Sequence, residues 1–259
     1  LLHQCGEHIR LLDHPCLLPL TEDDGAARAG GYAHVGVLGL SRAVHLAPHH
    51  RQLHIVVLFL QQSIHRIGQS DYIHIGSAIT SLPTKKEHPA RIAERAAMLD
   101  HVTDRRFEFG TGRGAGSHEL RMFNVLDPNE TKAMWDEVIR EIPRMWEQKD
   151  YDFHGEYFTV PTPHNILPKP YGPGHPPLWV ACGNPPTFAK AGSLGIGAIA
   201  FNFEPIYNLK GRVAAYKEAI VDPVEQIGQF RNDNVMMTNA VICLEDRETA
   251  RAIAKAKGR

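Results

Sequence analysis

From residue 71 onward, short β-branched and aromatic segments alternate with segments of helical periodicity. This alternation constrains the fold more than any single motif does. The expected strands are residues 72–79, 106–110, 178–181, 196–201 and 235–244. The expected helices are residues 89–102, 131–146, 187–193 and 247–257, and Pro143 is expected to kink the second of them.

Strands that alternate with helices form βαβ units around a parallel sheet, which is either open or closed into a barrel. The chain has 259 residues, and about 250 residues is typical of the closed eightfold form. Too few strands are recognisable for closure. We therefore expect an α/β fold of the (β/α)8 TIM-barrel type that is incomplete at its C-terminus, with residues 1–259 forming a single domain.

Charge and cysteine content exclude several classes of protein. The formal net charge is −1, which gives no electrostatic basis for binding nucleic acid or an anionic membrane. The densest apolar run, residues 55–60, is far shorter than the roughly 18 residues of a membrane span, and the opening segment lacks the pattern of a signal peptide. Four cysteines are too few for a disulfide scaffold. We expect a cytoplasmic protein.

Residues 1–70 differ in composition from the rest of the chain. They hold nine of the sixteen histidines and no Lys, Asn, Met or Trp. A metal-rich segment, a diverged segment and a segment translated from an erroneous reading frame all remain open as explanations. The side chains that could bind zinc match no common finger spacing, so we expect no metal site and keep a zinc module only as an alternative. These side chains are His3, Cys5, His8, His14 and Cys16.

Two glycine-containing segments follow expected strands. Residues 110–116 read Gly-Thr-Gly-Arg-Gly-Ala-Gly, in which glycines allow a ligand to approach backbone N–H groups and Arg113 offers a planar set of donors to a phosphate. A tight turn with a solvated arginine is an equally good interpretation of these residues alone. In residues 181–187, Thr187 could cap a helix or donate to an anion, and capping is the more common role.

A proline-rich connection occupies residues 154–177, and its length favours a functional loop. We expect the histidines of the turns to be surface or loop residues rather than ligands: His118, His154, His164 and His175. The tryptophans Trp135 and Trp146 lie at helical spacing with Met145, which predicts a place in the core.

Residues 72–203 resemble the bacterial luciferase-like flavin-dependent monooxygenases. The resemblance runs in order through several short motifs, and the ordered set is more specific than any one of them. The motifs are Leu82-Pro83-Thr84, His88-Pro89, the helix of residues 91–100, residues 106–114 (RFEFGTGRG), residues 155–158 (GEYF), residues 176–181 (PPLWVA) and residues 191–195 (AGSLG).

The resemblance implies a TIM barrel that binds reduced flavin, usually FMN, and uses molecular oxygen to oxidise a small organic substrate. It implies that Arg113, between Gly112 and Gly114, holds the flavin phosphate. The strand end at Ala181, Cys182 and Gly183, together with Thr187, would complete the phosphate site, and Ala78 and Ile79 would lie against the flavin ring. Gly112 stands where luciferases proper carry a cysteine, so we do not expect light emission.

The active-site histidine of this family comes from a Glu-His-His pattern. Its counterpart by spacing is Pro48-His49-His50, which lacks the glutamate and falls within the histidine-rich segment. If the match holds, His49 or His50 would act as a general acid or base. Members of the family are commonly longer, so we expect the last barrel strand and its helix to be missing.

The expected partners are therefore a small organic substrate and a separate flavin reductase, with homodimer formation left open. Two alternatives remain. One is a relative that transfers hydride with a deazaflavin. The tail of a deazaflavin is longer and more anionic than that of FMN, so a phosphate site with the single cation Arg113 fits FMN better. The other is a non-catalytic flavin-binding protein or a truncated relative.

Overall fold

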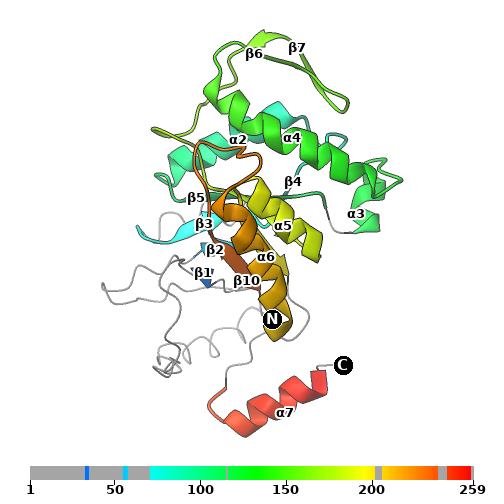
Figure 1. Ribbon diagram of the computed structural model, residues 1–259, viewed down its shortest axis with the longest axis vertical. Coiled ribbons are helices and arrows are strands. Elements are labelled where there is room, and N and C mark those ends of the chain that lie inside the picture. Colours follow the sequence, from blue (N-terminus) through cyan, green and yellow to red (C-terminus); the bar gives the residue numbers. More distant parts are fainter. Residues whose placement is uncertain are drawn as a thin grey trace, which may run out of the picture. The chain divides into compact units, whose positions relative to one another are not determined.

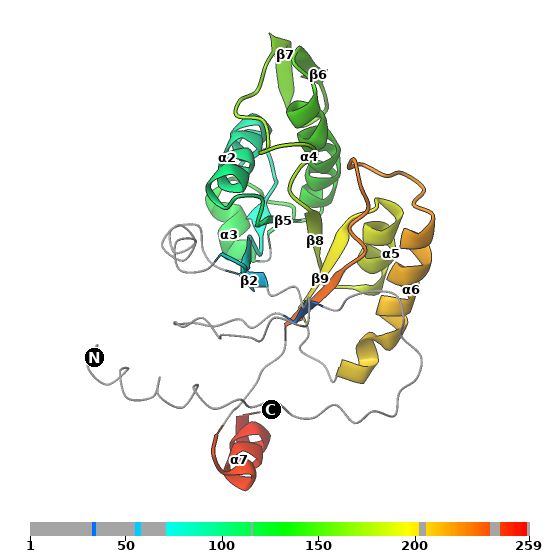
Figure 2. The same ribbon diagram turned by 90° about the vertical axis from the view of Figure 1, so that its left-hand side faces the viewer.

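A curled sheet of eight strands, all paired in parallel, organises the part of the chain that the structure describes (Figures 1 and 2). The structure is a computed structural model that describes residues 33–34, 55–57, 71–114, 116–201, 206–238 and 244–257, all within one unit, residues 31–259. The sheet order is β1-β10-β9-β8-β5-β3-β2, with β4 also paired to β5. The strands are β1 (Ala33–His34), β2 (Ile55–Val57), β3 (His74–Gly76), β4 (Thr80–Ser81), β5 (Phe107–Gly112), β8 (Leu178–Cys182), β9 (Gly197–Phe201) and β10 (Val235–Thr238).

The described strands do not close into a full barrel, because no pairing joins β1 to β2 among them. The prediction of a (β/α)8 barrel is therefore confirmed only as a parallel α/β sheet. The helices are α2 (Pro89–Val102), α3 (Ser117–Met122), α4 (Glu130–Glu147), α5 (Pro185–Ser193), the 3-10 helix η2 (Ile206–Leu209), α6 (Lys210–Val221) and α7 (Arg247–Lys257). Helices α2 and α5 pack on the sheet, α4 packs on α2, and α6 packs on α5.

Most of the expected elements are confirmed, and α2 and α7 have the expected ends. The prediction that a glycine-rich turn begins at Gly110 is wrong, because strand β5 continues through Gly110 and Thr111 to Gly112. The reason is pairing on both sides, since Gly110 lies opposite Trp179 of β8 and Thr111 lies opposite Thr80 of β4. Helices α3 and α6 were not anticipated, and α6 has no amphipathic pattern strong enough to have indicated it.

The alternating side chains of β5 separate two layers of core. Phe107 and Phe109 point to the helix side, where they join the large apolar cluster that includes residues of α2, α4 and α5. Trp135, Met145 and Trp146 are buried in that cluster, as expected. On the other side of the sheet, Trp179, Ile199 and Met236 form a smaller buried cluster with Ala78 and Ile79 packed against it. The sheet is therefore apolar on both faces, as parallel sheets usually are.

The proline-rich connection is not a simple loop, because an antiparallel hairpin occupies part of it. Strand β6 (Tyr151–His154) pairs with β7 (Thr159–His164). The carboxylate of Glu137 on α4 accepts the backbone N–H groups of residues 156, 157 and 158 at 2.8, 3.0 and 3.3 Å. A Cβ at Gly155 would lie 2.5 Å from Glu137 Oε1, so a larger residue there would displace this carboxylate. Glu137 thus fixes the hairpin turn to α4.

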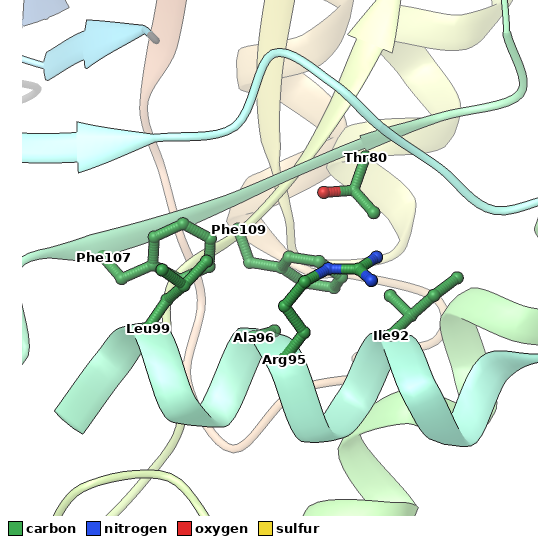
Figure 3. A pocket seen from close by; sticks show the side chains of 7 residues that line it. All are labelled: Thr80, Ile92, Arg95, Ala96, Leu99, Phe107 and Phe109. Atoms are coloured by element: carbon green, nitrogen blue, oxygen red, sulfur yellow. The ribbon is translucent and has the colours of Figure 1, made fainter. Parts of the chain in front are cut away.

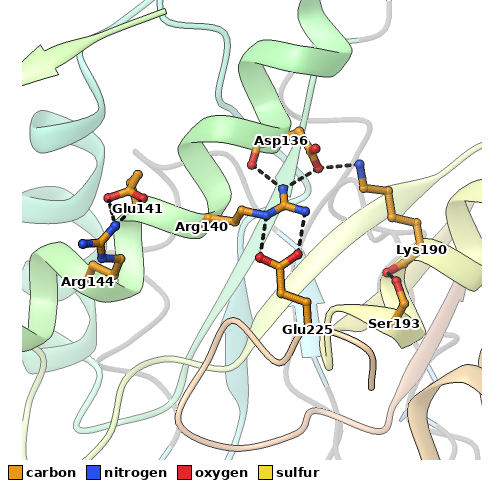
Figure 4. A network of polar contacts seen from close by, with 7 residues as sticks. All are labelled: Asp136, Arg140, Glu141, Arg144, Lys190, Ser193 and Glu225. Atoms are coloured by element: carbon orange, nitrogen blue, oxygen red, sulfur yellow. Dashed lines mark hydrogen bonds and ion pairs between the residues drawn. The ribbon is translucent and has the colours of Figure 1, made fainter. Parts of the chain in front are cut away.

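An ion-pair network ties α4 and α5 to the segment after α6 (Figure 4). Arg140 of α4 contacts Asp136 at 2.6 Å and donates from Nε and Nη2 to the two carboxylate oxygens of Glu225, at 2.8 and 2.9 Å. Lys190 of α5 also pairs with Asp136. The bidentate geometry of Arg140 and Glu225 is the kind that contributes to orientation as well as to stability.

His175 corrects the expectation of a surface histidine, since it is 8% exposed. Its ring stacks between Trp146 and Phe230, with centroid distances of 5.8 and 4.9 Å. Nδ1 lies 2.8 Å from the carbonyl oxygen of Pro176, and Nε2 accepts the backbone N–H of Gln229 at 2.9 Å. Both nitrogens are therefore used by a neutral ring, and burial lowers the pKa of His175.

This burial predicts a loss of stability in mild acid. The unfolded chain takes up the His175 proton below its ordinary pKa of about 6.5, whereas the folded chain does so only at a lower pH. The free energy of unfolding should therefore fall as the pH decreases from about 6.5 to the folded pKa, by at most about 1.4 kcal/mol per pH unit from this residue. Urea unfolding of wild type and His175→Asn between pH 5 and 8 measures this. Equal slopes for the two proteins would contradict the prediction.

None of the described helices combines the length and apolarity required to cross a bilayer. Within the same residues, no group of three or more His, Cys, Asp or Glu side chains is arranged to hold a metal ion. The zinc-module residues of the first sixteen positions lie outside the described part of the chain.

Candidate functional site at the carboxyl edge of the sheet

The carboxyl ends of β4, β5, β8 and β9 lie side by side. Ser81 is in register with Gly112, Thr111 with Val180, and Cys182 with Ala200. Because these strands are parallel, the segments that follow them leave the same edge of the sheet. Ligand sites in α/β folds are usually found at this edge.

Three of the segments expected to bind flavin meet at Gly112. A Cβ at this position would lie 2.4 Å from Cδ1 of Ile79 and 3.5 Å from Cβ of Ala181. The peptide bond between Ala78 and Ile79, in the short interval between β3 and β4, is cis. The structure thus brings Ile79, Gly112 and Ala181 together from three separate segments at this edge of the sheet.

Arg113 follows β5 directly and its side chain is exposed. Nη1 donates to the carbonyl oxygen of Pro128 at 3.2 Å and to Oγ1 of Thr131 at 3.3 Å. Both acceptors are neutral, and within the described ranges Arg113 contacts no carboxylate. An exposed guanidinium of this kind keeps its charge available for an anion.

Two lysines that follow β4, Lys85 and Lys86, are already paired with carboxylates. Lys85 donates to Glu130 at 2.9 Å, and Lys86 is paired with Glu119. Glu119 lies close to the glycine-rich segment, since a Cβ at Gly114 would be 3.4 Å from its Oε2. Gly114 has a φ of +85°, a conformation that favours glycine. Arg113 is thus an uncompensated cation beside two neutralised ones.

Helix α5 begins at the end of β8 in a way that limits its backbone donors. Asn184 caps the helix, and its Oδ1 accepts from the backbone N–H of Thr187 at 3.2 Å and from the Thr187 hydroxyl at 2.6 Å. Pro185 and Pro186 occupy the first helical positions and have no N–H to offer. Gly183 is exposed, with no atom within 4 Å of where a Cβ would stand. Asn184, and not Thr187, is therefore the cap, and the Thr187 hydroxyl donates to the capping side chain.

The side chain of Cys182 does not face this space. It is 1% exposed, and its Sγ contacts the carbonyl oxygens of Val180 and Thr187. Burial raises the pKa of the thiol to about 12, so the group is a neutral thiol near pH 7. Cys182 could contribute to a ligand site through its backbone only.

A buried polar group that the sequence reading missed lies deeper in the sheet. Glu108, between Phe107 and Phe109, is 2% exposed. Its Oε2 accepts from Nε1 of Trp179 at 2.6 Å, and its Oε1 lies 2.8 Å from Nδ1 of His74. A charged residue in the middle of an otherwise apolar strand was the signal that could have identified it.

A small crevice lies on the helix side of the sheet, between α2 and β5 (Figure 3). Its volume of about 10 Å³ has room for roughly one water molecule. Arg95 lines it and forms a bidentate pair with Glu87, at 2.7 and 2.6 Å. This crevice is too small for a flavin. His49 and His50, the expected acid or base, lie outside the residues that the structure describes.

Comparison with known proteins agrees with the fold and with the family resemblance. Residues 68–257 match the family described as luciferase-like monooxygenases. The flavin-dependent trigonelline monooxygenase oxygenase component of Acinetobacter baylyi is 34% identical over 119 residues, which are 46% of this chain and 32% of that protein. The alkanal monooxygenase alpha chain of Photorhabdus luminescens is 26% identical over 155 residues, 59% of this chain and 41% of that one.

An F420-dependent glucose-6-phosphate dehydrogenase of Amycolatopsis mediterranei is 28% identical over 129 residues, 49% of this chain and 38% of that protein. The chain spans about half or less of the length of these curated relatives. Relatives with two different cofactors are thus similar to this sequence.

Solved structures share the fold. The monooxygenase RslO1 of Streptomyces bottropensis has a TM-score of 0.65 at 19% identity, covering 80% of this chain and 66% of that one. The oxygenating constituent of 3,6-diketocamphane monooxygenase of Pseudomonas putida, in complex with FMN, has a TM-score of 0.63 at 18% identity, covering 76% and 56%. Given the family match over residues 68–257, the chain belongs to the luciferase-like monooxygenase family.

Proposed function

We propose that this chain binds reduced FMN at the carboxyl edge of the sheet and uses molecular oxygen to oxidise a small organic substrate. The family makes the protein an oxidoreductase. The observation that carries the proposal is the meeting of Ile79, Gly112 and Ala181 next to the exposed, charge-uncompensated Arg113. Apolar side chains and a glycine suit a flat ring packed against them, and a terminal phosphate requires a cation nearby.

The residues present fit the phosphate end of a flavin. Arg113 would hold the phosphate oxygens, and the Thr187 hydroxyl would donate to them after turning away from Asn184. The backbone at Gly183 offers open space for the phosphate to approach. Ala78, Ile79 and Gly112 would orient the ring, while Gly114 gives the chain the turn that directs Arg113 outward. Bound reduced flavin would supply the electrons that activate oxygen.

We assign the acid or base role to His49 or His50, on the resemblance alone. A neutral imidazole near pH 7 can hold or release a proton at a substrate oxygen. The oxygenase component named among the relatives supports a separate reductase as partner of this chain. A cytoplasmic location fits such a partnership, and a homodimer is part of the same proposal.

The second candidate is hydride transfer with the deazaflavin F420, which the Amycolatopsis relative favours. Charge argues for FMN instead. The pairs Lys85–Glu130 and Lys86–Glu119 neutralise two nearby cations, which leaves Arg113 and Lys132, whose Nζ contacts Oδ1 of Asn129 at 3.4 Å, for a phosphate group. A longer anionic tail would need additional free cations.

An anaerobic titration of the purified chain with reduced FMN tests the proposal. We expect saturable binding, and Arg113→Ala should weaken it about 10- to 100-fold, because a charge-assisted contact to phosphate is lost. Reduced F420 and riboflavin serve as comparison ligands. Tighter binding of F420 than of FMN, or equal FMN binding by wild type and Arg113→Ala, would refute the assignment.

A second measurement separates catalysis from binding alone. With a flavin reductase, NADH and candidate substrates, an oxygenase gives oxygen-dependent product. FMN binding without any such product across a broad panel of substrates would favour the non-catalytic alternative.

A further inference from the structure

Thr131 lies in the first turn of α4, and its side chain is completely buried. Its hydroxyl oxygen is 2.6 Å from the carbonyl oxygen of Pro128 and 3.3 Å from Nη1 of Arg113. A hydroxyl has one hydrogen and two lone pairs. Because the carbonyl of Pro128 can only accept, the single hydrogen of Thr131 points to Pro128. The Thr131 oxygen must therefore accept from Arg113, so the sense of each hydrogen bond is fixed.

The same geometry decides which nitrogens of Arg113 remain for a ligand. Nη1 carries two hydrogens, and its two acceptors are Pro128 and Thr131. Nε and Nη2 have no acceptor among the residues that the structure describes. These two nitrogens form one edge of the guanidinium, the arrangement that binds two oxygens of a phosphate at once.

We propose that Thr131 is a positioning residue for phosphate recognition, which holds one nitrogen of Arg113 so that the Nε and Nη2 edge faces the ligand. This inference rests on the proposed function. An exposed arginine otherwise samples many rotamers, and ordering it on binding has an entropic cost. Thr131 is well suited to the role because it is buried in a helix and its own hydroxyl is fixed by Pro128.

The test compares reduced FMN with reduced riboflavin, which lacks the phosphate, in anaerobic titrations of five proteins. These are wild type, Thr131→Val, Thr131→Ser, Arg113→Ala and the double variant Thr131→Val with Arg113→Ala. Valine keeps the shape of threonine and removes the hydroxyl, whereas serine keeps the hydroxyl. Thermal unfolding checks that each variant is folded, and Thr131→Ala replaces the valine variant if that one is not.

We expect Thr131→Val to weaken FMN binding about 3- to 10-fold, which is the effect of one ordinary hydrogen bond, because Arg113 is then held less firmly. Riboflavin binding should not change, and Thr131→Ser should bind FMN nearly as wild type does. In the Arg113→Ala background, Thr131→Val should cause no further loss, because the residue acts through Arg113.

The other possible outcomes separate a failure of the positioning role from a failure of the proposed function. If Arg113→Ala weakens FMN binding and Thr131→Val does not, the positioning role is wrong while the proposed function stands. If Thr131→Val weakens FMN and riboflavin equally, its effect is structural and the inference is overturned. If Arg113→Ala leaves FMN binding unchanged, or wild type binds neither flavin, both the phosphate site and the inference fail.

Discussion

Replacing Gly110 with alanine is expected to cost at least about 4 kcal/mol of unfolding free energy and to leave little folded protein. A Cβ at this position would lie 1.8 Å from the backbone oxygen of Ser77 and 2.9 Å from Cδ1 of Ile199. The Ser77 hydroxyl also donates to the Gly110 carbonyl at 2.8 Å, which holds the two segments together. Backbone cannot move aside as a side chain can, so the clash would separate β5 from the interval between β3 and β4.

Urea unfolding and soluble yield measure the effect of Gly110→Ala. The matched control is Gly116→Ala, four residues beyond the end of β5, where no atom lies within 4 Å of the added group. The control should differ from wild type by no more than about 1 kcal/mol, since alanine is a poorer N-cap than glycine. A Gly110→Ala protein as stable as this control would show that β5 and Ser77 are not in close contact.

Gly192→Ala is expected to destabilise the protein by about 3 kcal/mol, although alanine is the better helix former. In an isolated helix, the change would stabilise by about 1 kcal/mol. Gly192 lies where α5 meets α6, and a Cβ there would lie 2.6 Å from the backbone oxygen of Tyr216 and 2.7 Å from Cβ of Ala219. The two helices would have to separate, which would expose Phe188 and Ile220 of their shared core.

The control for this second prediction is Gly211→Ala in the first turn of α6. No atom lies within 4 Å of its added methyl group, so helix propensity should dominate and stability should stay equal or rise by up to about 1 kcal/mol. Chemical denaturation of the two variants gives opposite signs if α5 and α6 pack as described. Stabilisation by both substitutions would contradict that packing.

The sequence predicted helices better than strand ends, for a local reason. The stripe of Ile92, Ala96 and Leu99 and the proline at the start of α2 are contained in one segment, so its bounds followed from the sequence. The end of β5 depends instead on pairing with β4 and β8, which no local pattern records. Gly110 and Gly112 suggested a turn, yet they serve close contacts within a strand.

The same distinction between local patterns and contacts made across the fold holds for the candidate site. Arg113 and Gly114 were assigned through the motif of residues 106–114, since the glycines and the arginine alone fit a tight turn equally well. Thr131 could not be assigned in this way, because a threonine at the start of a helix is common and its contact with Arg113 is made 18 residues away. Cys182 was assigned by its neighbours in the motif, and alternation along β8 turns its side chain to the helix side. His49 and His50 stay predictions.

The two prolines that begin α5 also reduce the conformational entropy that this segment can lose when a ligand binds. Their rings restrict the backbone of residues 185 and 186 before folding and after it. Asn184 then fixes the hydroxyl of Thr187 from within the same turn. This wall of the site is therefore rigid by covalent structure. If a phosphate binds there as proposed, only the Thr187 hydroxyl has to turn, and little of the binding free energy is spent on ordering the backbone.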